Sequence, residues 1–162
     1  MTDNVIQLKE NKNILKLYIQ DENGNKTGEY LEFNLEDIEL PTKYQAIIEE
    51  DKKARINLKN QYVIIDKKED RKGKKLLSAN EEAKIKAVQE FLKKEVEIYN
   101  MFLGENGVQK LLNGEKLCWS SLEYIDEIIT KQIMPQLEIN AEDIKSKIMS
   151  KYSVKKADDV IE

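Results

Sequence analysis

The first part of the chain alternates between apolar and polar positions, with a short turn sequence in the middle. Residues 14–20 (ILKLYIQ) are rich in β-branched and aromatic side chains, and residues 29–35 (EYLEFNL) alternate in the same way. Between them, the segment DENGNKTG supplies Asn and Gly, which tolerate the positive φ angles of a chain reversal. Residues 13–35 are therefore predicted to form a β-hairpin. The hairpin must pack on another element, because an isolated hairpin is only marginally stable in water.

Beyond the hairpin, apolar positions recur with the period of an α-helix. Pro41 suits the first turn of a helix, because its missing N–H would have no partner there. Apolar stripes then predict helices over residues 41–66, 79–103 and 119–137. Pro135 is expected to end or kink the last of these helices, since proline cannot donate a backbone hydrogen bond.

The ends of the second predicted helix carry recognisable signals. Ser78 and Glu81 have the spacing of a capping box, in which two side chains satisfy free backbone N–H groups at the start of a helix. Gly104 is suited to the end of the same helix, because glycine adopts left-handed backbone angles readily. These signals fix the expected start and end of this helix.

The length of 162 residues suits a single domain with an appended terminal segment. We expect a flexible N-terminus over residues 1–12, one domain over residues 13–138, and a C-terminal helical extension and tail over residues 139–162. The expected fold class is α+β, mainly α. In it, an N-terminal β-hairpin packs on a bundle of two long helices, and shorter helices follow towards the C-terminus.

The helix over residues 79–103 has an apolar face wider than one neighbouring helix can cover. The stripe expected to face the first helix consists of Ile85, Val88, Leu92, Val96, Tyr99 and Leu103. A second stripe beside it contains Phe91, Ile98 and Phe102. Either the hairpin or a partner chain can cover this second stripe. Coverage by the hairpin is favoured for Phe91, because the hairpin must pack somewhere.

The C-terminal extension carries a further apolar edge. It consists of Ile144, Ile148 and Met149 on a short helix predicted to start near Asn140. Nothing else in the chain is an obvious cover for this edge. These three residues are therefore candidates for contact with a partner, together with the second stripe.

Composition narrows the chemistry further. Charged residues make up 36% of the chain, and 27 Lys and Arg against 31 Asp and Glu give a net charge of −4, which argues against a general binder of polyanions. Histidine is absent and cysteine occurs once, so there is no basis for an internal disulfide, a Cys/His zinc site, a Ser-His-Asp triad or a Cys-His dyad. We therefore expect that the protein is not an enzyme and that it binds no cofactor or metal.

One segment of the predicted hairpin matches the spacing of a calcium-binding loop. The matching residues are Asp21, Asn23, Asn25, Glu29 and Glu32. Position 6 of such a loop needs Gly for its sharp bend, but it is occupied here by Lys26, which also brings a positive charge. The flanking segments are strands rather than helices. An ordinary hairpin turn is therefore favoured.

Charged residues cluster at several other points. The connection between the two long helices contains Lys67, Lys68, Arg71, Lys72, Lys74 and Lys75. It lacks aromatic residues on which bases could stack and is diluted by acidic residues, so a solvated connector is favoured over a nucleic-acid site. Carboxylates at 36–39, at 49–51 and at Asp126–Glu127 are expected on outward faces. Cys118 and Trp119 are expected to pack rather than react, since no histidine is present to activate the thiol.

Two segments resemble the small tail-assembly-chaperone-type proteins of phages and prophages of Gram-positive bacteria. The first is residues 31–38 (LEFNLEDI), followed by a long charged helix; the second is residues 102–114 (FLGENGVQKLLNG), followed by a helix from Trp119. The resemblance covers about residues 29 to 138. The strand-like segment over residues 14–20 and the extension after Leu137 depart from the family pattern.

The resemblance implies a non-enzymatic protein of tail morphogenesis. Its partners would be the tape-measure protein, which it would keep soluble, the tail-tube subunits, or a second copy of itself. A role as a structural virion component stays open. A second alternative also stays open, in which the chain is a small phage-encoded protein that binds nucleic acid or blocks host defence through the basic connection.

The location expected from the sequence is the host cytoplasm, with association with the virion as the alternative. The first residues lack a basic stretch followed by an apolar run, as a secretory signal would have. No window approaches the run of about 20 apolar residues that a membrane span needs. An unpaired Cys118 also suits a reducing compartment.

Overall fold

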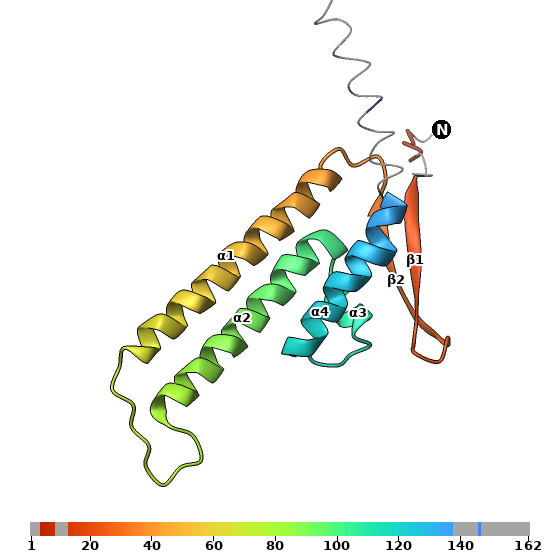
Figure 1. Ribbon diagram of the computed structural model, residues 1–162. Coiled ribbons are helices and arrows are strands. Elements are labelled where there is room, and N and C mark those ends of the chain that lie inside the picture. The colour runs from red at the N-terminus through yellow and green to blue at the C-terminus, as the bar shows by residue number, and fades with distance from the viewer. Residues whose placement is uncertain (1–3, 9–12, 138–145, 147–162) are drawn as a thin grey trace, which may run out of the picture.

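The computed structural model describes residues 4–8, 13–137 and 146 (Figure 1). The fold is α+β and mainly α, as predicted, with an N-terminal antiparallel hairpin packed against helices. The elements in chain order are β1 (Ile14–Gln20), β2 (Lys26–Asn34), α1 (Leu40–Asp66), α2 (Ala79–Leu103), α3 (Gly107–Leu111), α4 (Trp119–Ile128) and the π-helical turn η1 (Ile129–Ile133). The partner candidates Ile144, Ile148 and Met149 lie outside the described residues.

The hairpin is joined by a hydrogen-bonded turn. Strands β1 and β2 pair antiparallel, with Leu17 opposite Leu31. The Asp21 carboxylate accepts hydrogen bonds from the backbone N–H groups of Asn23 and Asn25, both at 2.9 Å. These two bonds stabilise the turn between the strands. Glu29 and Glu32, at the last two positions of the calcium-loop spacing, lie within the extended strand β2, so the backbone here does not have the form of such a loop. The buried side of β2 includes Phe33, which is 2% exposed and anchors the hairpin on the helices.

Helices α1 and α2 form a long antiparallel pair (Figure 1). The hairpin, α3 and α4 gather around the C-terminal half of α2, while the far ends of α1 and α2 extend beyond them to the basic connection. One apolar cluster of buried side chains links the hairpin, α1, α2 and α4. The core therefore sits at one end of the helical pair.

The predicted helix boundaries hold, with one irregularity. The capping box is present: the Ser78 hydroxyl accepts the N–H of Glu81 at 3.2 Å, and the Glu81 carboxylate accepts the N–H of Ser78 at 3.4 Å. The last helix continues past Pro135 to Leu137, but Ile129–Ile133 widens into a π-helical turn. The proline ring would clash with a carbonyl one turn earlier, and a wider turn relieves this clash.

The structure reverses the two apolar stripes of α2. Phe91, Ile98 and Phe102 are only 5%, 1% and 5% exposed, so these residues are core and do not face a partner. Ile85 is 43% exposed, and the side chains of Val88, Leu92 and Val96 are half-buried. The expectation that these four residues fill the space against α1 is therefore wrong, although the last two members of that stripe, Tyr99 and Leu103, are buried as expected.

The aromatic stripe is buried because several elements cover it together. The Phe102 ring lies 5.4 Å from that of Phe33 on β2 and 5.6 Å from that of Tyr44 on α1, measured between centroids. The Phe91 ring lies 5.6 Å from that of Trp119 on α4. The favoured cover for Phe91 was the hairpin. That prediction is wrong: Trp119 on α4 and Arg55 on α1 lie against the Phe91 ring, whereas the hairpin residue Phe33 contacts Phe102.

Candidate functional site

The exposed side of α2 borders an open groove of about 670 Å³. Helix α2 supplies one wall, and the segment that leads into α4 supplies the other. The residues that line it are Val88, Gln89, Leu92, Lys93, Val96, Lys116, Leu117, Cys118 and Trp119. Leu117 is 7% exposed and anchors the second wall in the core. The groove is thus largely apolar at its base and carries lysines at its edges.

Trp119 forms the rim of the groove at the start of α4. It is 50% exposed, and its other face packs on the buried Phe91 ring. It is the single tryptophan of the chain. A large aromatic side chain that is fixed on one face and open on the other is typical of a binding anchor.

Cys118 lies beside Trp119 and is exposed, which corrects the expectation that it packs. Its sulfur lies 3.2 Å from the Ser120 hydroxyl and 3.0 Å from the Ser121 hydroxyl. Hydrogen bonds from Ser120 and then Ser121 lower the pKa of the thiol to about 7. The absence of histidine therefore does not leave the thiol unperturbed, because two serine hydroxyls close to it in the chain act on it instead.

A second polar feature lies inside the bundle, where three carboxyl groups from three helices approach one another. They are Asp51 on α1, Glu95 on α2 and Asp126 on α4. Glu95 is 0% exposed, and as a carboxylate neither of its oxygens has a hydrogen-bond donor. The other two have partners: Arg55 donates to Asp51 at 3.1 Å, and the Tyr99 hydroxyl donates to Asp126.

Burial determines the protonation of this acid cluster of Asp51, Glu95 and Asp126. Burial, followed by the hydrogen bond to Asp51, raises the pKa of Glu95 to about 9. Burial also raises the pKa of Asp126. Glu95 is therefore protonated near pH 7, and its hydroxyl can donate a hydrogen bond to Asp51. An ionised Glu95 would have no proton to donate. The expectation that these carboxylates face outward is wrong for Asp51 and Asp126, which are partly buried.

A pattern signal for Glu95 was present in the sequence. Glu95 lies four residues after Phe91 and three before Ile98, so it occupies the same helix face as the buried stripe. An acid at such a position must find a partner or stay protonated. The cluster is also closed: its other members are already paired, and a cavity of only about 160 Å³ lies beside Asp51, Tyr99 and Asp126.

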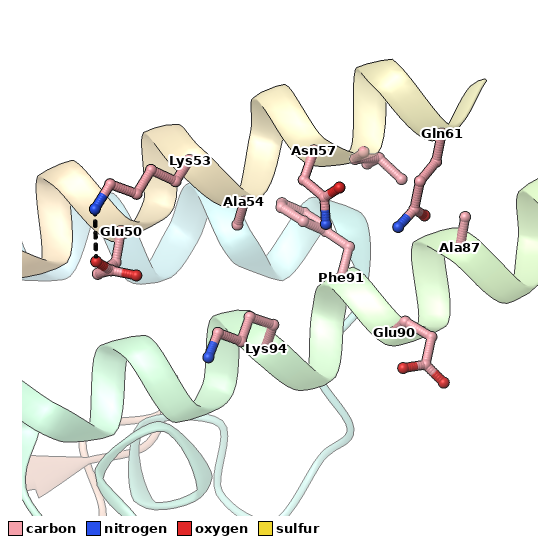
Figure 2. Close-up of a pocket in the computed structure, with 10 residues that line it drawn as sticks. Glu50, Lys53, Ala54, Asn57, Gln61, Ala87, Glu90, Phe91 and Lys94 are labelled. Carbon is pink, nitrogen blue, oxygen red and sulfur yellow. Dashed lines mark hydrogen bonds and ion pairs between the residues drawn. The ribbon is translucent and has the colours of Figure 1, made fainter. Parts of the chain in front are cut away.

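A cleft between α1 and α2 opens on a face shown in Figure 2. Its volume is about 400 Å³, and small or apolar residues such as Ala54, Ala87 and Phe91 lie at its base. The amide side chains of Asn57 and Gln61 point across it towards α2 (Figure 2). Its other lining residues are Glu50, Lys53, Leu58, Glu90 and Lys94. This cleft is solvated and of mixed charge, and it holds no pair of groups suited to nucleophilic or acid–base chemistry.

The basic connection between α1 and α2 is exposed along its whole length. All six of its predicted basic residues point into solvent at the far end of the helical pair. It is nevertheless tied to α2, because the Asp70 carboxylate accepts the N–H of Asn80 at 3.0 Å and Asn80 donates to the carbonyl of Lys68 at 3.0 Å. The first of these bonds lowers the pKa of Asp70. These hydrogen bonds hold the connection against the first turn of α2.

Among the described residues, no group of three or more Asp, Glu or Cys side chains is arranged to hold a metal ion. Within the same residues, no helix combines the length and apolar character that crossing a bilayer requires. Comparisons of the chain with protein families, with curated proteins and with solved structures find no match.

Proposed function

We propose that this protein is a non-enzymatic binding protein of phage or prophage tail assembly. It holds an apolar helical segment of a tail protein, such as the tape-measure protein, in the groove between α2 and Trp119. The observation that carries the proposal is the apolar stripe of Val88, Leu92 and Val96, which no other described element covers fully. Contiguous apolar surface of this kind is typical of interaction sites.

The alternatives inside the molecule are weaker candidates for binding. The acid cluster is buried and internally paired, and the cleft between α1 and α2 is lined by side chains of both charges. A groove beside the hairpin also has exposed aromatic side chains, Tyr18 and Tyr124, but the surface that lines it is mainly polar. The groove along α2 combines a mainly apolar surface with Trp119, which Phe91 holds on one face. Burial of apolar surface drives most protein association, so a partner would gain from covering this groove.

The resemblance to tail-assembly chaperones supports a tail protein as the partner. The two segments that carry this resemblance can be located in the fold. Residues 31–38 run from β2 into the approach to α1, and residues 102–114 contain the turn from α2 into α3. In that turn Gly104 has a φ of +94°, which favours glycine, and Val108 is 1% exposed. These segments contact each other through Phe33 and Phe102 and so form part of the core on which α2 packs.

Binding can be measured through Trp119 without any label. Purified protein would be titrated with peptide segments of a phage tape-measure protein, with tryptophan fluorescence as the readout. We expect a saturable blue shift, because a partner in the groove would remove water from the indole ring. The double variant Leu92→Ser/Val96→Ser should weaken binding at least about tenfold, since it removes apolar contact at the groove base.

A matched control comes from the outer side of α1. Ile56 and Val63 are 51% and 47% exposed and lie away from the groove. The variant Ile56→Ser/Val63→Ser removes as many apolar side chains and should bind as tightly as the unaltered protein. Equal loss in both variants, or no fluorescence response with any tail segment, would overturn the proposal.

A further inference from the structure

The open part of the apolar stripe has the length and spacing of a helix-binding surface. Ile85, Val88, Leu92 and Val96 recur every three or four residues along one side of α2. From the first to the last of them the helix rises about 17 Å, or about three turns. A partner helix of similar length, with apolar side chains at the same spacing, would match this surface.

The charged residues that line the groove have one sign of charge. Lys93 and Lys116 line it, and none of its lining residues is acidic. Groups that flank an apolar seam in this way select the partner and its orientation more than they add affinity.

We propose that the groove binds a short amphipathic helix whose apolar side is flanked by Asp and Glu. This inference rests on the proposed function and specifies the chemistry of the partner segment. The apolar side chains of the helix contact Val88, Leu92 and Val96, and Trp119 closes over one end. The acidic flanks lie beside Lys93 and Lys116.

A second copy of this chain fits the groove less well. In a two-fold antiparallel pairing of α2 with itself, the same edge of each helix meets its own counterpart. In a pairing centred on Leu92, Lys93 would then lie close to the Lys93 of the other copy. Like charges in such positions oppose association, so the groove discriminates against self-pairing while it attracts an acidic edge.

The test uses two designed helical peptides of about three turns that share their apolar residues and differ only at the flanks, one with Glu and one with Lys. Both would be titrated into the full-length protein with Trp119 fluorescence and circular dichroism as readouts. The Glu peptide should bind at least about tenfold more tightly and gain helix on binding, and added salt should reduce the difference.

Charge reversal identifies the lysines responsible. The variant Lys93→Glu/Lys116→Glu should prefer the Lys peptide. The control Lys72→Glu/Lys75→Glu changes the net charge equally, but it lies on the exposed connection away from the groove, so it should keep the original preference. A similar change in both variants would show a response to net charge alone and would overturn the inference.

Further outcomes separate this inference from the proposed function. If both peptides bind equally, the acidic edge is refuted while a groove-binding function stands. If tape-measure segments bind but neither peptide does, the partner is not a simple amphipathic helix, and only this inference fails. If nothing binds and sedimentation shows a dimer with Trp119 protected, the occupant is a second copy and both proposals fail.

Discussion

Replacing Glu95 with Gln should remove most of a pH dependence from the stability of the protein. The glutamine amide has nearly the same shape as the protonated acid and can donate to Asp51 in the same way. It cannot ionise. The change therefore isolates the proton on Glu95 from the packing of its side chain.

The sign and size of the effect follow from the pKa of Glu95, which is about 9 in the folded protein against an ordinary value of 4.5. Between these values the folded protein keeps a proton that the unfolded chain releases. The free energy of unfolding therefore falls as the pH rises through this window, by at most about 1.4 kcal/mol per pH unit. Between pH 6 and pH 8 the loss approaches about 2–3 kcal/mol at this limit.

Urea denaturation at several pH values between 6 and 8 measures this slope directly. The Glu95→Gln variant should show a much smaller slope; Asp126, whose pKa burial also raises, contributes in the same sense. Glu97→Gln is the matched control, because its exposed carboxylate lies on the same helix and should leave the slope unchanged. A Glu95→Gln variant with the slope of the unaltered protein would refute the assignment of the proton to Glu95.

The remaining predictions concern packing, the connection, metals and the C-terminus. Phe91→Ala should cost about 3–5 kcal/mol in denaturant unfolding, because it empties a buried site, and Leu92→Ala should cost less because that side chain is only partly buried. A Gly/Ser linker in place of the connection should lower the melting temperature, and a linker that retains Asp70 should restore most of it, since Asp70 accepts the N–H of Asn80. Neither Ca²⁺, EDTA nor ATP should shift the melting temperature by several degrees, because the Asp21 carboxylate is already bonded to backbone N–H groups. Deletion of residues 139–162 should leave the far-UV circular dichroism of the remaining helices unchanged. It should weaken association with a partner chain, measured by sedimentation. An unfolded truncated protein would contradict this prediction.

Local signals in the sequence were sufficient for the elements of this fold. Alternation predicted the hairpin over 13–35, and the strands end within one residue of those bounds. The capping box at Ser78 has a local physical cause, in that its partner lies three residues away. Such features depend on neighbours in the chain, so a single sequence contains the information they need.

The orientation of α2 could not be obtained in the same way. Helical spacing shows which side chains share a face, but it does not show which face meets which neighbour. Contacts with segments distant in the chain determine the orientation of α2. Examples are the ring contacts of Phe33 with Phe102 and of Trp119 with Phe91. The acid cluster could not be predicted for the same reason, because Asp51 and Glu95 lie on different helices.

The orientation that α2 adopts has a physical cost that bears on function. It buries Glu95 while Leu92 and Val96 stay partly exposed, which is the opposite of what the stability of an isolated chain favours. A buried acid needs a proton or a partner, and partly buried apolar groups gain less from folding than fully buried ones. Natural sequences depart from such rules mainly at functional sites. A partner helix in the groove would bury Leu92 and Val96 and so complete the burial that this orientation leaves unfinished.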